Sequence, residues 1–151
     1  MPSESEAVRV LIVAHKTAAT PALQAAVRAR AQAGPARFTL LVPALAHGLH
    51  RVVDPEDTGD AEAHDVLELA LPVLEEAAGA EVEGMIGVAD PLDAIQDAVN
   101  LHGFDEVILS TLPTRVSRWL KLDLPHKVTG LGLPVTVVTA KGTEHLAGHA
   151  S

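Results

Sequence analysis

The stretch Val88–Thr111, "VADPLDAIQDAVNLHGFDEVILST", decides the fold because it contains a turn, a helix and a strand in succession. Asp90 can cap a helix whose first turn holds Pro91, and Asp93 places an acid near the positive end of that helix. Gly103 is placed to end the helix. The run that follows, "DEVILST", is apolar enough for a buried strand. This succession predicts a βαβ unit in a parallel sheet.

The rest of the chain shows the same alternation. Besides the strand at 105–111, apolar runs predict strands at 8–15, 36–44, 80–88 and 133–140. Thr20, Pro21 and Gly34 are placed to begin and end a helix between the first two strands. A second helix follows a long polar loop, and Pro72 should kink or split it. Its residues at core spacing are Val66, Leu69, Ala70, Val73, Leu74 and Ala77.

These elements predict a single α/β domain over residues 1–141. We expect an open, mostly parallel five-stranded sheet of the Rossmann-like type, with helices on both faces. Residues 142–151 are expected to form a disordered tail.

Composition limits the classes of function. The chain has a net charge of −9, 2% aromatic residues and no cysteine. The negative charge and the scarcity of stacking residues argue against a nucleic-acid partner. The lack of cysteine excludes disulfides, thiolate nucleophiles and iron–sulfur clusters. The N-terminal "MPSESEAVRV" lacks a signal-peptide pattern, and the apolar runs are too short to cross a bilayer. We therefore expect a cytoplasmic protein with no membrane partner.

Open parallel sheets bind ligands beyond the carboxyl ends of the strands, where the strand order reverses. If the first and fourth strands are the central neighbours, a crevice should lie between their ends. Its predicted lining is His15, Lys16, Thr17, Ser110 and Thr111.

Basic residues gather beside this predicted crevice. No Lys or Arg lies between residues 52 and 114, whereas Arg115, Arg118, Lys121 and Lys127 follow closely. One interpretation is an acidic solvated face next to ordinary surface bases. The other is a positive rim that attracts a small anion.

The chain resembles the universal stress protein family in its order of elements, in the stretch Val88–Thr111 and in the closing "LPVTVV". The resemblance covers nearly the whole chain. It implies an open sheet of about five parallel strands and a homodimer formed through the last strand, Val135–Thr139.

ATP-binding members of that family carry the motif G-x2-G-x9-G-[S/T] after the fourth strand. Its positions fall here at Leu109, Leu112, Leu122 and Asp123, and no glycine lies between residues 105 and 129. The acidic residue that the family uses at the end of the first strand falls at about His15. The resemblance is therefore to the branch without the glycine motif. Neither ATP nor AMP is expected as a cofactor, because leucine side chains occupy the space that a phosphate needs.

The segment that replaces the glycine motif predicts a short helix, Arg115–Leu122, on which Val116, Trp119 and Leu120 share one face. The favoured interpretation is that this face packs over the sheet edge. A second is a dimer or protein-partner surface anchored by Trp119 and Arg118. A third is an anion site in which Arg115 and Arg118, with Lys16, replace glycine amides.

Metal binding is not favoured, because the loop residues His47, His50 and Asp54 have no fixed ligand spacing. A small hydrolase that uses Ser110 or Thr111 with His15 or His126 is a weaker alternative, since no G-x-S-x-G motif is present.

We therefore expect a non-enzymatic regulatory or protective domain that acts through binding, without binding ATP in the usual way. The alternative is a nucleotide or small-anion sensor that uses Arg115 and Arg118 at the crevice. The candidate binding residues are His15, Lys16, Thr17, Ser110, Thr111, Arg115 and Arg118.

Overall fold

The computed structural model describes residues 7–44, 60–113 and 117–140, and strands and helices alternate within them. The elements are β1 (Val8–Val13), α1 (Pro21–Ala33), β2 (Ala36–Pro43), α3 (Asp60–Ala78), β3 (Val82–Gly87), α4 (Pro91–His102), β4 (Glu106–Thr111), α5 (Arg118–Lys121), α6 (Leu124–Thr129) and β5 (Val135–Thr139). No helix in these three ranges is long and apolar enough to cross a membrane.

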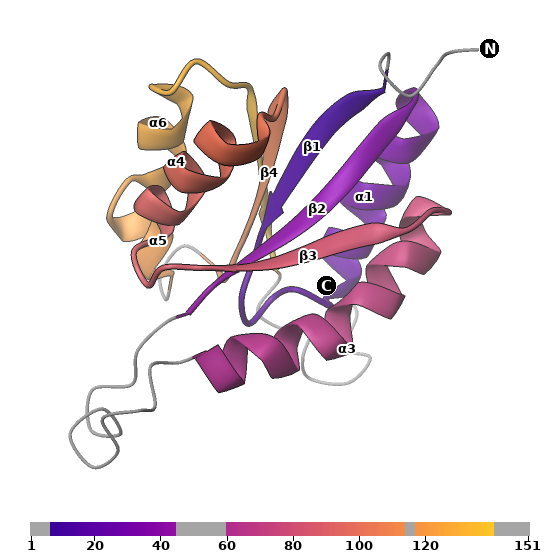
Figure 1. Cartoon of the computed structure of the whole chain (residues 1–151), viewed down its shortest axis with the longest axis horizontal. Coiled ribbons are helices and arrows are strands. Elements are labelled where there is room, and N and C mark those ends of the chain that lie inside the picture. Colours follow the sequence, from indigo (N-terminus) through magenta and orange to yellow (C-terminus); the bar gives the residue numbers. More distant parts are fainter. Residues whose placement is uncertain (1–6, 45–59, 114–116, 141–151) are drawn as a thin grey trace.

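The five strands form one sheet in the order β3-β2-β1-β4-β5, and all four pairings are parallel. β1 and β4 are neighbours, with Val10 beside Glu106 and Val13 beside Leu109. Helices α1 and α3 cover one face of the sheet, and α4, α5 and α6 cover the other (Figure 1). The predicted α/β sheet with helices on both faces is confirmed.

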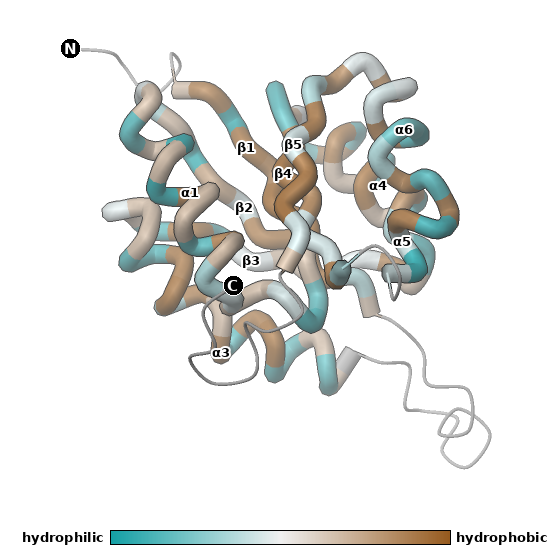
Figure 2. The backbone as a smooth tube through the Cα atoms, turned by 180° about the vertical axis from the view of Figure 1, so that it is seen from behind, coloured by the Kyte–Doolittle hydropathy of each residue, from teal (hydrophilic) through white to brown (hydrophobic). Residues whose placement is uncertain are grey.

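Two hydrophobic clusters hold the three layers together, and the strands divide their side chains between them. Val10 and Ile12 of β1 face the α1 and α3 side, whereas Leu11 and Val13 face the α4 and α6 side. All four are fully buried because β1 lies in the middle of the sheet. In Figure 2 the central strands are accordingly the most hydrophobic part of the backbone, and polar residues lie along the helices.

Helix α4 begins and ends as its local sequence predicts. The side chain of Asp90 accepts hydrogen bonds from the backbone N–H groups of Leu92, at 2.9 Å, and Asp93, at 3.1 Å. Gly103 adopts a positive φ of 76°, and its N–H donates to the carbonyl oxygen of Val99. The left-handed conformation is one that glycine adopts without a Cβ penalty, so the helix stops here.

Helix α3 differs from its prediction in two respects. It runs without interruption past Pro72, which lies on its exposed side, so the proline does not split it. The side chain of Leu69, predicted to be in the core, is 73% exposed. Leu67 is buried in its place, and together with Leu71 it packs closely against the backbone of Gly84 in the edge strand β3.

The segment after β4 forms two short helices. The predicted helix Arg115–Leu122 is shorter in the structure, because α5 spans Arg118–Lys121 with Ser117 as its N-cap; Arg115 and Val116 lie outside the described residues. Asp123 adopts a left-handed conformation, with φ of 59°, and separates α5 from α6.

Candidate functional site

A cleft of about 570 Å³ lies at the carboxyl ends of β1 and β4, between the helices of the two faces. This is the place where an open parallel sheet offers a ligand site, because the connections from the two strands leave in opposite directions. Its lining comes from β4, the loop after β1 and the starts of α3, α4 and α5. The lining residues are His15, Lys16, Thr17, Glu62, Ala89, Asp90, Pro91, Ser110, Thr111, Leu112, Ser117, Arg118, Trp119 and Leu122.

Buried hydroxyl groups line the strand ends of the cleft. The Oγ1 atom of Thr17 and the Oγ atom of Ser110 are 2.6 Å apart, a short hydrogen bond between the loop after β1 and strand β4. Thr111 donates from its Oγ1 to the Oγ1 of Thr139 in β5, at 3.5 Å. These hydroxyls bond to one another, which offsets the cost of their burial.

His15 and Glu62 meet at the α3 side of the cleft. The Nε2 atom of His15 lies 3.4 Å from the Oε1 atom of Glu62, and His15 is only 5% exposed. Glu62 was not among the predicted site residues, because nothing in its local sequence distinguishes it from the other acids of α3. Its place in the site follows only from the packing of α3 against the sheet.

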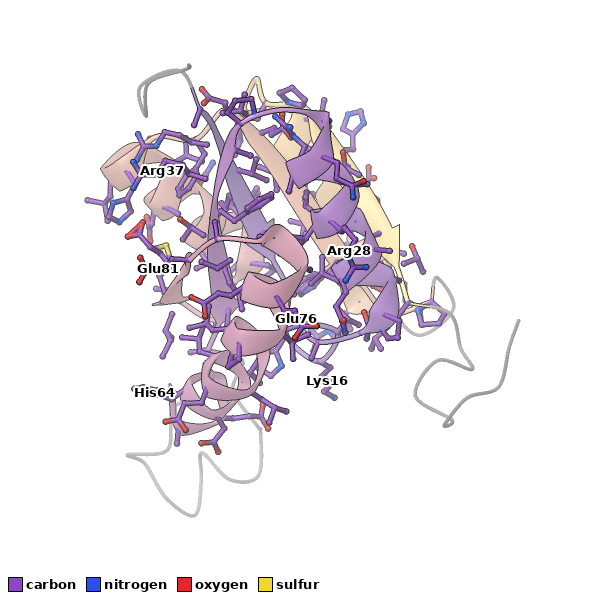
Figure 3. The ribbon with its side chains drawn as sticks, turned by 90° about the vertical axis from the view of Figure 1, so that its right-hand side faces the viewer. Lys16, Arg28, Arg37, His64, Glu76 and Glu81 are labelled. Carbon is purple, nitrogen blue, oxygen red and sulfur yellow. The ribbon has the colours of Figure 1, made fainter. Side chains whose placement is uncertain are left out.

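Two cationic side chains line the cleft, Lys16 from the loop after β1 and Arg118 from α5. Both residues are exposed, and neither forms an ion pair with any other residue that the structure describes. Figure 3 shows Lys16 at the same end of the molecule as His64, near the start of α3, and far from Arg37 at the opposite end. Arg115, the other predicted cation, lies outside the described residues.

Leucine and tryptophan side chains line the cleft beside these cations. Leu112 follows β4 directly, and Trp119 and Leu122 come from α5 and its end. Trp119 also packs against the hydrophobic cluster beneath α4 and α6, as the packing interpretation expects of this residue; Val116 lies outside the described residues.

Two of the four positions assigned to the glycine motif line the cleft as expected, and two do not. Leu112 and Leu122 line the cleft, and Leu109 is fully buried in the core. Asp123 does not line the cleft either, although it stands at the position of the motif hydroxyl. Two N-terminal amides of α4 already donate hydrogen bonds to Asp90, so they are not free to bind a phosphate.

The hydrolase and metal hypotheses gain no support from the geometry. The hydroxyl of Ser110 is bonded to Thr17, His15 contacts Glu62, and His126 is an exposed residue outside the cleft lining. Among the residues in the three described ranges, no group of three His, Asp or Glu side chains could hold a metal ion. The proposed loop ligands His47, His50 and Asp54 lie outside those ranges.

Solved structures show what this fold is similar to. A universal stress protein from Archaeoglobus fulgidus superposes with a TM-score of 0.61 at 15% identity, over 87% of this chain and 93% of that one. A member of the universal stress protein family from Burkholderia pseudomallei gives 0.61 at 16% identity, over 93% and 100%. The Archaeoglobus fulgidus universal stress protein in complex with dAMP gives 0.55 at 16% identity, over 89% and 98%.

Neither a protein-family model nor a curated protein matches the sequence. The solved structures confirm the predicted similarity to universal stress proteins, at the level of the fold.

Proposed function

We propose that this protein is a cytoplasmic, non-enzymatic regulatory domain that acts by binding a small ligand in the cleft between the ends of β1 and β4. The cleft itself is the observation that carries the proposal, since it lies at the ligand-binding place of this fold and holds two cationic side chains without ion-pair partners among the described residues. A structure of similar fold has been solved with dAMP, which supports a binding role.

The ligand is not ATP held in the manner of a glycine-motif protein. Glycines allow backbone amides to approach a phosphate closely, and this chain has Leu112 and Leu122 at two of the corresponding positions. Both leucines line the cleft, which supports the proposal that a polyphosphate meets side chains here in place of backbone amides.

A small anion is the ligand type that the cleft supports best. Arg118 carries a planar fork of donors that matches a carboxylate or a phosphate, and Lys16 adds a second positive charge. A charge-assisted hydrogen bond contributes about 1.5–3 kcal/mol. We therefore expect the Arg118→Ala variant to bind an anionic ligand at least about tenfold more weakly. Lys127→Ala, an exposed lysine of α6 outside the cleft lining, is the matched control.

Isothermal titration calorimetry with AMP, dAMP, cyclic AMP, ADP and ATP tests this function. Binding should weaken as phosphates are added, and Arg118→Ala should weaken it where Lys127→Ala does not. Tightest binding by ATP would show that the leucines do not block a polyphosphate. If no small anion of any class binds the purified chain, the cleft is not a ligand site and the proposal is wrong.

We further propose that the protein forms a homodimer through β5, Val135–Thr139. This strand is an edge of the sheet, and Val137 is 41% exposed on it. An edge strand has free backbone groups that a second copy can pair with. Light scattering should give a dimer for the wild type and for Leu101→Asp, which alters an exposed leucine of α4, and a monomer for Val137→Asp. A monomeric wild type at high micromolar concentration would contradict the dimer.

A further inference from the structure

The cleft has an apolar side that a nucleotide phosphate would not use. Leu112, Trp119 and Leu122 contribute to its lining, together with Ala89 and Pro91. Leu122 is 53% exposed, so part of its side chain faces water. Apolar surface gains nothing from a phosphate, whereas a hydrocarbon chain or ring in the cleft would remove it from water.

The charges of the cleft favour one negative group over several. Lys16 and Arg118 are balanced by Glu62 and Asp90, so the formal charge of the lining is zero when His15 is counted as neutral. A single carboxylate can pair with Arg118, and the two acids then repel only one negative charge. A ligand with several charges would add repulsion from both acids to the gain from the cations.

The hydroxyl groups that line the cleft already make hydrogen bonds within the protein. Thr17 and Ser110 share a hydrogen bond of 2.6 Å, and Thr111 donates to Thr139. The hydroxyls of a ribose would therefore have to compete with these existing bonds for Thr17, Ser110 and Thr111. An apolar ligand body makes no such demand.

From these three features we propose that the cleft binds a monoanionic amphiphile, a carboxylate on an apolar chain or ring, with its charge at Arg118 and Lys16 and its body against Leu112, Trp119 and Leu122. This rests on the proposed function, because it names the ligand class of the same cleft. The volume of about 570 Å³ falls within the range of roughly 300–1,000 Å³ that is usual for small-molecule sites.

The fluorescence of Trp119 can report this binding directly, because Trp119 is the one tryptophan of the chain and lines the cleft. The full chain is titrated with hexanoate, octanoate and decanoate below the concentrations at which they form micelles. Each added methylene should tighten binding by about fourfold, the effect of burying one such group. Decanol, which has the same chain without the charge, should bind at least about tenfold more weakly than decanoate.

Two variants separate the apolar contact from the charge. Leu122→Ser should reduce the gain per methylene, and Arg118→Gln should remove most of the difference between decanoate and decanol. Leu101→Ser is the matched control for the leucine, because Leu101 is 75% exposed on α4 and does not line the cleft. Lys127→Gln is the matched control for the charge. If Leu122→Ser and Leu101→Ser give the same chain-length series as the wild type, the apolar side is not a binding surface.

A parallel titration with AMP distinguishes failure of this inference from failure of the proposed function. If AMP changes the fluorescence of Trp119 saturably and the carboxylates do not, the ligand class is wrong and the binding function stands. If neither type of ligand binds, the proposed function is wrong as well. Equal affinity for decanoate and decanol would overturn the role assigned to Arg118 and Lys16.

Discussion

Gly87 at the end of β3 leaves no room for a methyl group, so Gly87→Ala tests how closely α4 packs on the sheet. A Cβ at this position would lie 2.7 Å from the Cβ of Ala94 and 2.9 Å from the Cδ1 of Leu41. The Leu41 side chain can rotate slightly, but the Cβ of Ala94 is attached to the helix backbone, so α4 itself has to move. Overpacking of this kind costs about 1–3 kcal/mol, and we expect a loss of about 2 kcal/mol in the free energy of unfolding.

Urea unfolding followed by far-ultraviolet circular dichroism measures this loss. With a slope of about 2 kcal/mol/M, the midpoint should fall by about 1 M. Gly34→Ala is the control, because a Cβ added there would meet no atom within 4 Å beyond its chain neighbours, and its φ of 162° is extended backbone. That variant should be unchanged or more stable by about 0.4–1 kcal/mol. If Gly87→Ala unfolds at the wild-type midpoint, α4 does not pack against β3 as closely as these distances require.

Three further predictions concern polar contacts. Thr17→Val removes the 2.6 Å partner of the buried Ser110 hydroxyl and leaves it only a 3.5 Å contact with the carbonyl oxygen of residue 17, so it should cost about 1–3 kcal/mol. The double variant Thr17→Val/Ser110→Ala should cost less than the sum of the single variants in urea unfolding, and additive costs would contradict the hydrogen bond. Asp90→Ala should lower the free energy of unfolding by about 1 kcal/mol, because α4 loses its N-cap. In thermal unfolding Asp90→Ser should recover most of this stability, and an equal loss in both variants would contradict capping. The Nε atom of Arg30 and the Oε1 atom of Glu106 lie 2.6 Å apart at a partly exposed site. A double-mutant cycle should give a coupling energy below about 1 kcal/mol for this pair. A coupling energy that added salt does not reduce would contradict this estimate.

The helices differ in how well their sequences predicted them. The signals of α4 are local, because Asp90 caps amides two and three residues away and Gly103 bonds back to Val99. These signals act whatever the rest of the chain does. The signals that select the buried face of α3 are not local in this sense. Its many leucines and alanines suit more than one face, and the positions of β2 and β3 select Leu67 over Leu69.

The candidate site was partly predictable for a related reason. A residue at or directly after the end of a buried parallel strand must lie at the carboxyl edge of the sheet, so the strand positions alone place His15, Thr17 and Ser110 at that edge. That they share one cleft required the further assumption that the first and fourth strands are neighbours, which the structure confirms. Glu62 reaches the same cleft from α3, and no local pattern indicates that the start of this helix lies beside His15, in the loop after β1. The side on which Trp119 packs depends likewise on α4 and α6.

By itself the sequence determined the alternation of strands and helices, the ends of α4, and the replacement of the motif glycines by leucines, because each of these depends on residue type and near neighbours. Only the tertiary structure decided the strand order β3-β2-β1-β4-β5, and with it the pairing of β1 with β4. Thr17 and Ser110 are 93 positions apart in the chain and 2.6 Å apart in the cleft. Such proximity comes from the parallel pairing of distant strands, which no short stretch of sequence specifies.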